Sequence, residues 1–499
     1  MEIQFQKSVF PCLKTVCRQY LSQEQTQEIR VPEGMPDIGT VLTAWGQIVI
    51  RGKDWHASSA GVTGGVMVWV LYLPEDGSGV QQLETWLPFQ QTWDFPETTR
   101  EGNLQVIPML RSVDARTLSA RKMMVRASVG LLGQATVPEE LELYTPEQLP
   151  EDIQVLKKTY PLRLPVETGE KAFHLEETLS VPNTYAPIEK LLRYWLNPSL
   201  SEMKVVADKL VMRGIAGLGA LYCGTDGQLH TWEYDLPFSQ YTQLNQDYPP
   251  EAQADVYFAV TSLELEPGEE NTLNLKAGIT GQYTLYDTAV AEIAEDAYSL
   301  TRQLTPGWGK VDIPAILDSR TDTVTAQQNL QTDMLRVLDV CFYPENPEMH
   351  RQGEAVQAEL SGVFQVLGYS PDGELQTATA RWESPHTIAA DGNVDLEMSV
   401  QPVGRPSGSA GPGDVSLLAQ MQLQTNTVFA QTMEYLTDLE TGEAAEPDPS
   451  RPSLILRRAG NDSLWEIAKS AGSTVADIQK ANNLQSEPEQ DQMLLIPVR

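Results

Sequence analysis

The residues best suited to acid–base, nucleophilic or metal chemistry are few and widely separated. Five histidines occur in the 499 residues, namely His56, His174, His230, His350 and His386. None lies in an HExxH pattern or at the spacing of a nucleophile and its base. Cys12 and Cys17 are separated by four residues, but no second Cys or His pair follows to complete a zinc site. We therefore expect no metal site.

Two other stretches could suggest a ligand, and each has a simpler interpretation. His174 with Glu176 and Glu177 is better explained as a solvated polar stretch than as a ligand set. Gly217 and Gly219 lie inside a strand pattern, where a bulge or close packing usually accounts for glycine. No Gly-Lys-Ser/Thr phosphate loop and no GxGxxG sequence follows a strand pattern. The sequence predicts no cofactor and no enzymatic activity.

The last stretch of the chain, Ser453 to Arg499, has the clearest local pattern. Apolar runs at 454–456 and 493–496 predict two strands. Between them, Ser463 with Glu466 and Thr474 with Asp477 have the spacing of capping boxes, so each pair predicts a helix start. Gly472 and the Asn482-Asn483 pair predict the two helix ends. The order strand, helix, helix, strand fits within fifty residues.

This segment resembles a LysM module. The resemblance implies a core, for which the helical spacing supplies Leu464, Trp465, Ile467 and Ile478 and the last strand supplies Ile496. It also implies a groove for N-acetylglucosamine-containing glycans, rimmed here by Gly460, Asn461, Asp462, Ser463, Leu484, Gln485, Gln490 and Asp491.

The groove loops depart from the family in two places. Asn461 separates Gly460 from Asp462, where the family usually has Gly-Asp, and Gln490-Asp491 replaces the common Pro-Gly. Three interpretations follow: a glycan-binding groove, a site for a protein partner, or a small βααβ cap with no ligand. The departures favour a protein partner.

Composition limits the rest of the chain. The formal charge is −33, and residues 453–499 contribute five basic and six acidic side chains, so nearly all of the acidity belongs to residues 1–452. Such acidity argues against nucleic acid or an anionic membrane as partner, because phosphate binding draws on Lys and Arg. The first residues show no secretory signal and no window could span a bilayer, so we expect a cytoplasmic protein with reduced cysteines.

A hairpin pattern recurs three times. An apolar strand ends at Tyr72, Tyr222 or Tyr369; an Asp-Gly pair follows (76–77, 226–227, 372–373); and a returning strand leads to a proline-containing corner. Each copy closes with another alternating run, at 122–129, 272–279 and 394–400. The fold class predicted is mainly β: three tandem antiparallel β-sandwich-like modules plus the βααβ domain.

The predicted modules span residues 1–145, 146–290 and 291–437. Residues 438–452, acidic and containing three prolines, are predicted to be a linker that holds the terminal domain (453–499) away from the body. Residues 401–414 predict a mobile loop, and Lys53 to Gly64 look like an insert in the first module. The first module also has five tryptophans, which we interpret as core rather than as a sugar-binding stripe: Trp45, Trp55, Trp69, Trp86 and Trp93.

The tandem repeats with one C-terminal LysM domain resemble SipL-type spore-coat proteins. The resemblance implies a scaffold in the mother cell, at the forespore or spore-coat surface, that docks on a SpoIVA-like coat ATPase through its LysM domain. The alternative is a peptidoglycan-binding or chitin-binding wall protein, which would need an export route. A wall-lytic enzyme is a weaker third hypothesis, because the histidines are dispersed.

Overall fold

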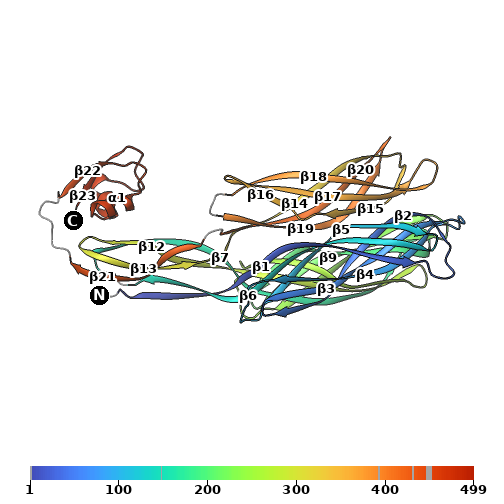
Figure 1. Cartoon of the computed structure of the whole chain (residues 1–499), viewed down its shortest axis with the longest axis horizontal. Coiled ribbons are helices and arrows are strands. Elements are labelled where there is room, and N and C mark those ends of the chain that lie inside the picture. Colours follow the sequence, from blue (N-terminus) through green and yellow to red (C-terminus); the bar gives the residue numbers. More distant parts are fainter. Residues whose placement is uncertain (1–2, 148, 391–393, 430–431, 445–451, 499) are drawn as a thin grey trace.

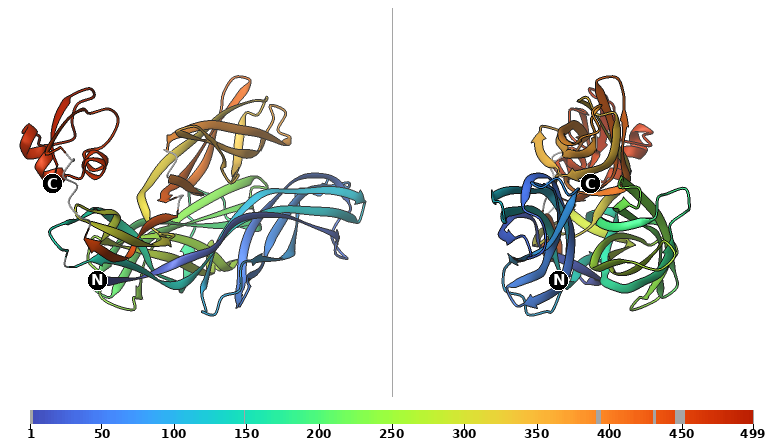
Figure 2. Two further views of the ribbon diagram at one scale, coloured as in Figure 1. Left: turned by 60° about the vertical axis from the view of Figure 1, so that its left-hand side comes forward. Right: turned by 90° about the vertical axis from the view of Figure 1, so that its right-hand side faces the viewer.

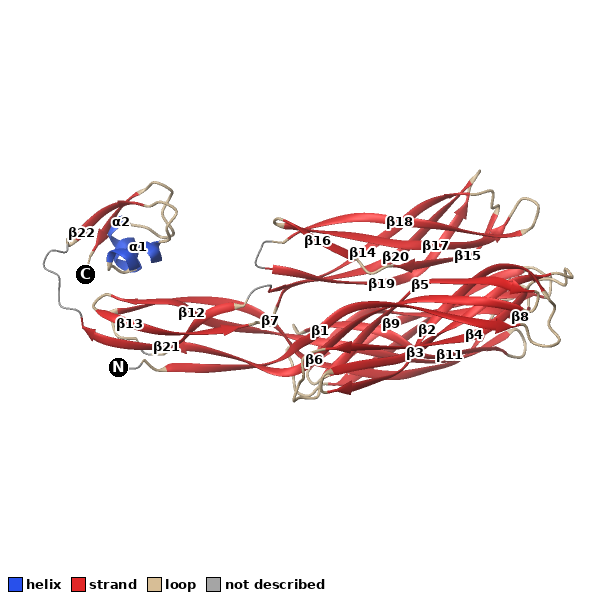
Figure 3. Cartoon of the chain, viewed as in Figure 1, coloured by secondary structure: helices blue, strands red, loops and turns tan. Residues whose placement is uncertain are grey.

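The computed structural model describes residues 3–147, 149–390, 394–429, 432–444 and 452–498. Strands account for 75% of the chain and helices for 3%, which confirms the mainly β prediction. The molecule is elongated, with strand-rich lobes at one end and a narrower part at the other (Figure 1). Both helices of the described residues lie in the C-terminal domain, beside the narrow end (Figure 3).

The strands follow one order three times. The first unit comprises β1 (Phe5–Arg30), β2 (Ile38–His56), β3 (Ser59–Pro74), β4 (Gln81–Asp94), β5 (Asn103–Ser119) and β6 (Lys122–Pro146). The second comprises β7 (Ile153–Ser180), β8 (Ile188–Val206), β9 (Lys209–Gly224), β10 (Leu229–Gln243), β11 (Gln253–Pro267) and β12 (Thr272–Ser299).

The third unit is built from shorter pieces. It comprises β13 (Arg302–Val311), β14 (Ile316–Gln331), β15 (Arg336–Pro344), β16 (Glu348–Gln352), β17 (Ala355–Tyr369), β18 (Leu375–Ala389), β19 (Val394–Ala410), β20 (Asp414–Phe429) and β21 (Met433–Ala444). Here β13 and β14 take the place of β1, and β20 and β21 take the place of β6. The predicted boundary at residue 290 lies inside β12.

Each unit contributes one antiparallel sandwich, which we call a head. In the first head the sheet β2-β3-β4 faces the sheet β1-β6-β5, and the valines of β3 and β6 at 66, 68, 70, 125 and 129 are fully buried between them. The Asp-Gly turns are confirmed: Gly77, Gly227 and Gly373 have φ angles of 69°, 75° and 79°. Down the long axis, the three heads surround one centre (Figure 2).

The narrow part of the molecule, which we call the stalk, is made by the far ends of the long strands. Three two-stranded ribbons, β1 with β6, β7 with β12, and β13 with β21, pair antiparallel there. All three supply the buried core, which contains Cys12, Leu143, Leu164, Ile293 and Tyr435. A lone ribbon cannot bury an apolar face in water, so the stalk requires all three units.

A buried cation joins the heads at their centre. Arg193 of β8 forms an ion pair with Asp339 of β15, and both side chains are at most 6% exposed. The Arg193 guanidinium lies 5.0 Å from the Trp45 ring of β2 and 4.3 Å from the Trp195 ring, and it donates to the Cys341 sulfur at 2.9 Å. Burial raises the pKa of the Cys341 thiol to about 12. The three units therefore share one junction.

The structure corrects four of the local predictions. Lys53 to Gly64 is no insert, because β2 and β8 are both 19 residues long and the segment is the β2–β3 hairpin end. Residues 401–414 are mostly strand, since β19 continues to Ala410 through a register shift after Val403. The predicted proline-containing corner of the first unit is strand instead, because Pro88 lies within the edge strand β4, where a missing backbone donor is tolerated.

The fourth correction concerns the predicted linker. Asp438 to Ala444 belong to β21, paired with β13, because their alternating side chains contribute to the stalk: Leu439 is fully buried. Residues 445–451 lie outside the described residues. By contrast, the core interpretation of the tryptophans is confirmed for Trp45, Trp69 and Trp93, each 1% exposed.

Candidate functional site: the terminal βααβ domain and its contact with the stalk

The two helices of the terminal domain begin and end at the predicted residues. Helix α1 (Leu464–Ala471) has a capping box: the Ser463 amide donates to the Glu466 carboxylate at 2.8 Å, and the Glu466 amide donates to the Ser463 hydroxyl at 3.3 Å. Gly472 ends α1 with a φ of 64°. Accepting hydrogen bonds from the Ser463 amide and hydroxyl lowers the pKa of the Glu466 carboxyl.

Helix α2 (Val475–Asn482) is capped by the Thr474 hydroxyl, which accepts from the Asp477 amide at 3.0 Å. Asn483 ends it with a φ of 53°. Strands β22 (Leu454–Arg458) and β23 (Met493–Pro497) pair antiparallel beside the helices. The Asn482 side chain donates to the Leu495 carbonyl at 2.7 Å and accepts from its amide at 2.8 Å, which ties α2 to β23.

The residues expected in the core of this domain differ in how deeply they are buried. Leu464, Ile467, Ile478 and Ile496 are at most 1% exposed and pack together. Trp465 is only partly buried by its own domain's cluster and faces the stalk. Its environment is therefore set by a segment far away in sequence.

The predicted groove residues come together in two neighbouring loops. Gly460, Asn461 and Asp462 are exposed in the loop before α1, and Gln485, Gln490 and Asp491 are exposed in the loop before β23, while Ser463 and Leu484 are partly buried. The Gln490 amide donates to the Asn461 side-chain oxygen at 3.2 Å, joining the loops. The Asp462 carboxylate is held by Arg457.

A carboxylate that sequence reasoning missed also lies between these loops. Glu487 accepts from the Leu464 amide at 2.8 Å, so it satisfies an orphan donor at the start of α1. The favourable position for an anion at this helix terminus is thus occupied by the chain itself. The exposed amides of Asn461, Gln485 and Gln490 remain in these loops, beside the exposed carboxylate of Asp491.

The opposite side of the domain docks on the stalk. The Trp465 indole N–H donates to the Asp296 carboxylate of β12 at 2.8 Å, and the Lys469 ammonium lies 2.7 Å from the same carboxylate. The Tyr298 ring meets the Trp465 ring edge to face, with centroids 4.8 Å apart, and the Tyr298 hydroxyl donates to the buried Ser473 carbonyl at 2.8 Å. Burial raises the pKa of Tyr298 to about 12.

This contact corrects the expectation that the terminal domain is held away from the body. Tyr298 is 7% exposed and belongs to the same buried cluster as Leu464 and Ile478. The groove loops stay exposed because docking uses α1 and the turn before α2 instead. One side of the domain thus contacts the stalk, and the side that carries the groove loops is exposed.

The histidines are not brought together into a site. His56 contacts Asp54 and His230 contacts Asp226, both at 3.0 Å and at hairpin ends of different heads. Within the described ranges, no cluster of three or more His, Cys, Asp or Glu side chains could hold a metal ion. Among the same residues, no helix has the length and apolar character needed to cross a bilayer.

The described chain is made of three β units and one small βααβ domain that docks on the stalk. Two family models match the chain: the SipL SPOCS domain at residues 187–267 and the LysM domain at residues 461–497. The first match covers β8 to β11 of the second unit. The chain thus contains a SipL SPOCS domain and a C-terminal LysM domain, the combination that the predicted resemblance implies, and these domains suggest a sporulation-related protein.

Neither matching domain is a catalytic one. A LysM domain suggests glycan or peptidoglycan binding. Curated proteins and solved structures gave no match to the chain.

Proposed function

We propose that the chain is a non-enzymatic scaffold of spore-coat or envelope assembly that docks on a SpoIVA-like coat ATPase through its LysM domain. The observation that carries this proposal is the docked orientation of the domain: Asp296 and Tyr298 fix α1 on the stalk, while the loops around Asn461 and Gln490 stay exposed. A rigidly presented module loses less orientational freedom on binding than one on a flexible tether, so its affinity for a large partner is higher.

The proposed organisation follows from this function. The three β units supply a long, acidic body, with β12 running to Ser299 and β21 to Ala444 instead of the predicted bounds at 290 and 437, and the LysM domain at 453–499 supplies the partner contact. The body would work in the mother cell at the forespore or spore-coat surface, where a scaffold needs no export. The high negative charge keeps such a body soluble and steers it away from nucleic acid.

Peptidoglycan is the second candidate partner. It is favoured by one observation, the neutral exposed amides of Asn461, Gln485 and Gln490 in the groove loops. Amides supply both donors and acceptors, which suits the acetamido and hydroxyl groups of a glycan. The two candidates use the same loops, so one set of variants tests both.

The test is a binding assay with the full chain against a purified SpoIVA-like ATPase and, in parallel, against insoluble peptidoglycan. The double variant Asn461→Ala/Gln490→Ala removes the loop-to-loop bond, and Gln303→Ala, exposed on β13, is the matched control. We expect the ATPase to bind wild type and control with equal affinity and the double variant at least tenfold more weakly.

Two outcomes would count against the scaffold proposal. Retention on peptidoglycan without ATPase binding would favour the wall-binding candidate. ATPase binding that the double variant leaves unchanged would place the partner contact outside the groove loops.

A further inference from the structure

The outer face of one sheet in the third head has an unusual composition. In β14-β20-β19, Thr321, Gln424 and Ser399 lie side by side across the strands, and so do Thr323, Gln422 and Gln401. With Thr325 and Gln420 in the next row, these eight side chains form what we call the amide–hydroxyl face. The alternating residues of β20, Ala419, Met421 and Leu423, are buried in the core of the head.

The corresponding faces of the other two units are charged. On β1 and β6, Glu24 pairs with Arg126 and Glu28 with Lys122. On β7 and β12, Glu176 lies opposite Lys276. None of these eight side chains is charged, although the whole chain carries −33; the next row along β19 brings Glu397, which pairs with Arg18. A surface that only keeps an acidic protein soluble has no need of such neutrality, so the composition points to a neutral, polar ligand.

One end of this face forms the floor of a cleft of about 550 Å³. Ser319, Thr321, Ser399, Gln401, Gln422 and Gln424 line it from the third head. An apolar wall faces them, formed by Leu200, Met203 and Val205 of β8. Charged residues in the lining are Lys204, Glu251 and Asp255. The volume falls within the range of roughly 300–1,000 Å³ that small-molecule sites occupy.

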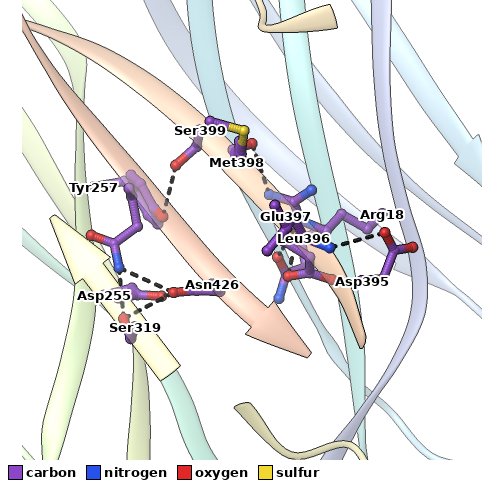
Figure 4. A network of polar contacts seen from close by, with 12 residues as sticks. Arg18, Asp255, Tyr257, Ser319, Asp395, Leu396, Glu397, Met398, Ser399 and Asn426 are labelled. Carbon is purple, nitrogen blue, oxygen red and sulfur yellow. Dashed lines mark hydrogen bonds and ion pairs between the residues drawn. The ribbon is translucent and has the colours of Figure 1, made fainter. Parts of the chain in front are cut away.

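A polar network holds the two heads at the end of the cleft (Figure 4). The Asn426 amide donates to the Asp255 carboxylate at 3.1 Å, and the Tyr257 hydroxyl lies 3.1 Å from the Ser399 hydroxyl. These bonds fix the cleft without using the whole face. Among the described residues, the side chains of Gln420 and Gln422 make no hydrogen bond, so their amides are available to a ligand.

From this arrangement we propose that the amide–hydroxyl face and its cleft bind a neutral oligosaccharide. The Gln and Thr side chains would exchange hydrogen bonds with sugar hydroxyls, because each amide both donates and accepts. The lining of the cleft is mainly polar, and Leu200 and Met203 would cover the apolar C–H side of a sugar ring. This site is separate from the LysM groove and independent of the function proposed above.

The test uses the full chain and two soluble probes, cellohexaose and the hexamer of N-acetylglucosamine, measured by calorimetry. To silence any binding at the LysM loops, all measurements are made in the Asn461→Ala/Gln490→Ala background. Within it, Gln420→Glu/Gln422→Glu places two charges on the face, and Gln27→Glu, exposed on β1, is the matched control. Thermal melts check that each variant folds, and Thr323→Ala replaces the charged variant if it does not.

We expect saturable binding of at least one hexamer, a loss of tenfold or more in the charged variant, and no change in the Gln27→Glu control. Absence of binding by both hexamers would overturn the proposal. So would binding that survives the two charges unchanged, since Gln422 lines the cleft and Gln420 lies in the next row of the face. A threefold or smaller loss in Thr323→Ala, used alone, would also overturn it.

Discussion

Removing one hydroxyl should loosen the LysM domain from the stalk. The Tyr298 hydroxyl donates at 2.8 Å to the carbonyl of Ser473, a residue with no exposed surface. In Tyr298→Phe that carbonyl loses its partner, at a cost of about 1–3 kcal/mol. The edge-to-face contact with Trp465 remains. The ratio of docked to undocked domains should therefore fall by a factor of roughly 5 to 150.

Adding Asp296→Ala should complete the release. This change removes the acceptor of the Trp465 indole, which is worth about 1.5–3 kcal/mol as a hydrogen bond to a charged group. The ion pair with Lys469 adds little, because that side chain is 46% exposed and solvent screens it. Tyr298→Phe keeps the ring that packs in the cluster with Ile467 and Ile478, and Asp296 lies outside that cluster, so the domain itself should stay folded.

The assay is hydroxyl-radical footprinting of Trp465 read by mass spectrometry, with small-angle scattering as a second readout. The oxidation rate of Trp465 should rise in Tyr298→Phe and rise further in the double variant. The matched control is Tyr435→Phe, which removes a hydroxyl donating to the Glu142 carbonyl at 3.0 Å inside the stalk. Unchanged oxidation in the double variant, or an equal rise in the control, would refute the docking argument.

Three further predictions concern stability. Leu464→Ala should destabilise the LysM domain by about 2–5 kcal/mol, seen as a lower melting temperature, because it leaves a cavity in a small core. Arg193→Ala should lower the free energy of unfolding by about 3–5 kcal/mol in a denaturant titration, because it leaves the Asp339 carboxylate buried and unpaired. Arg213→Ala, which breaks the exposed ion pair with Glu202 (side chains 60% and 40% exposed), should lower it by under about 1 kcal/mol in the same titration. Because folding lowers the pKa of the Glu466 carboxyl, this group stabilises the domain at pH values above its ordinary pKa of 4.5, and the stabilisation is lost as the pH falls through the folded-state pKa. Melting temperatures measured from pH 6 downward should therefore fall more steeply in wild type than in Glu466→Ala.

The terminal domain shows how much structure local sequence patterns can predict. Its caps depend on side chains three residues from the amides they satisfy, so Ser463, Thr474 and Gly472 predict both helices from sequence spacing alone. The Asp-Gly turns succeed for the same reason, since positive φ angles are a local requirement. Leu464 and Ile467 lie inside because helical periodicity places them on one face.

Predictions failed where the partner of a segment lies far away in sequence. Asp438 to Ala444 look like an acidic linker, but β13, more than a hundred residues earlier, supplies their hydrogen bonds. Residues 401–410 look like a flexible loop, yet β20 pairs with them across an irregular register. Proline and glycine lower strand propensity, and tertiary pairing overrides so weak a preference.

The sequence by itself determined the β-rich class, the three hairpin repeats and the whole βααβ domain, because alternating strand patterns, tight turns and helix caps depend on residues that are close together in the sequence. Only the tertiary structure decided how these parts combine: that three ribbons merge into one stalk, that Arg193 joins the heads, and that Trp465 packs on Tyr298 at the edge of its own domain's core. Those contacts join residues more than a hundred positions apart, and no local preference specifies which distant surface a half-buried side chain will meet.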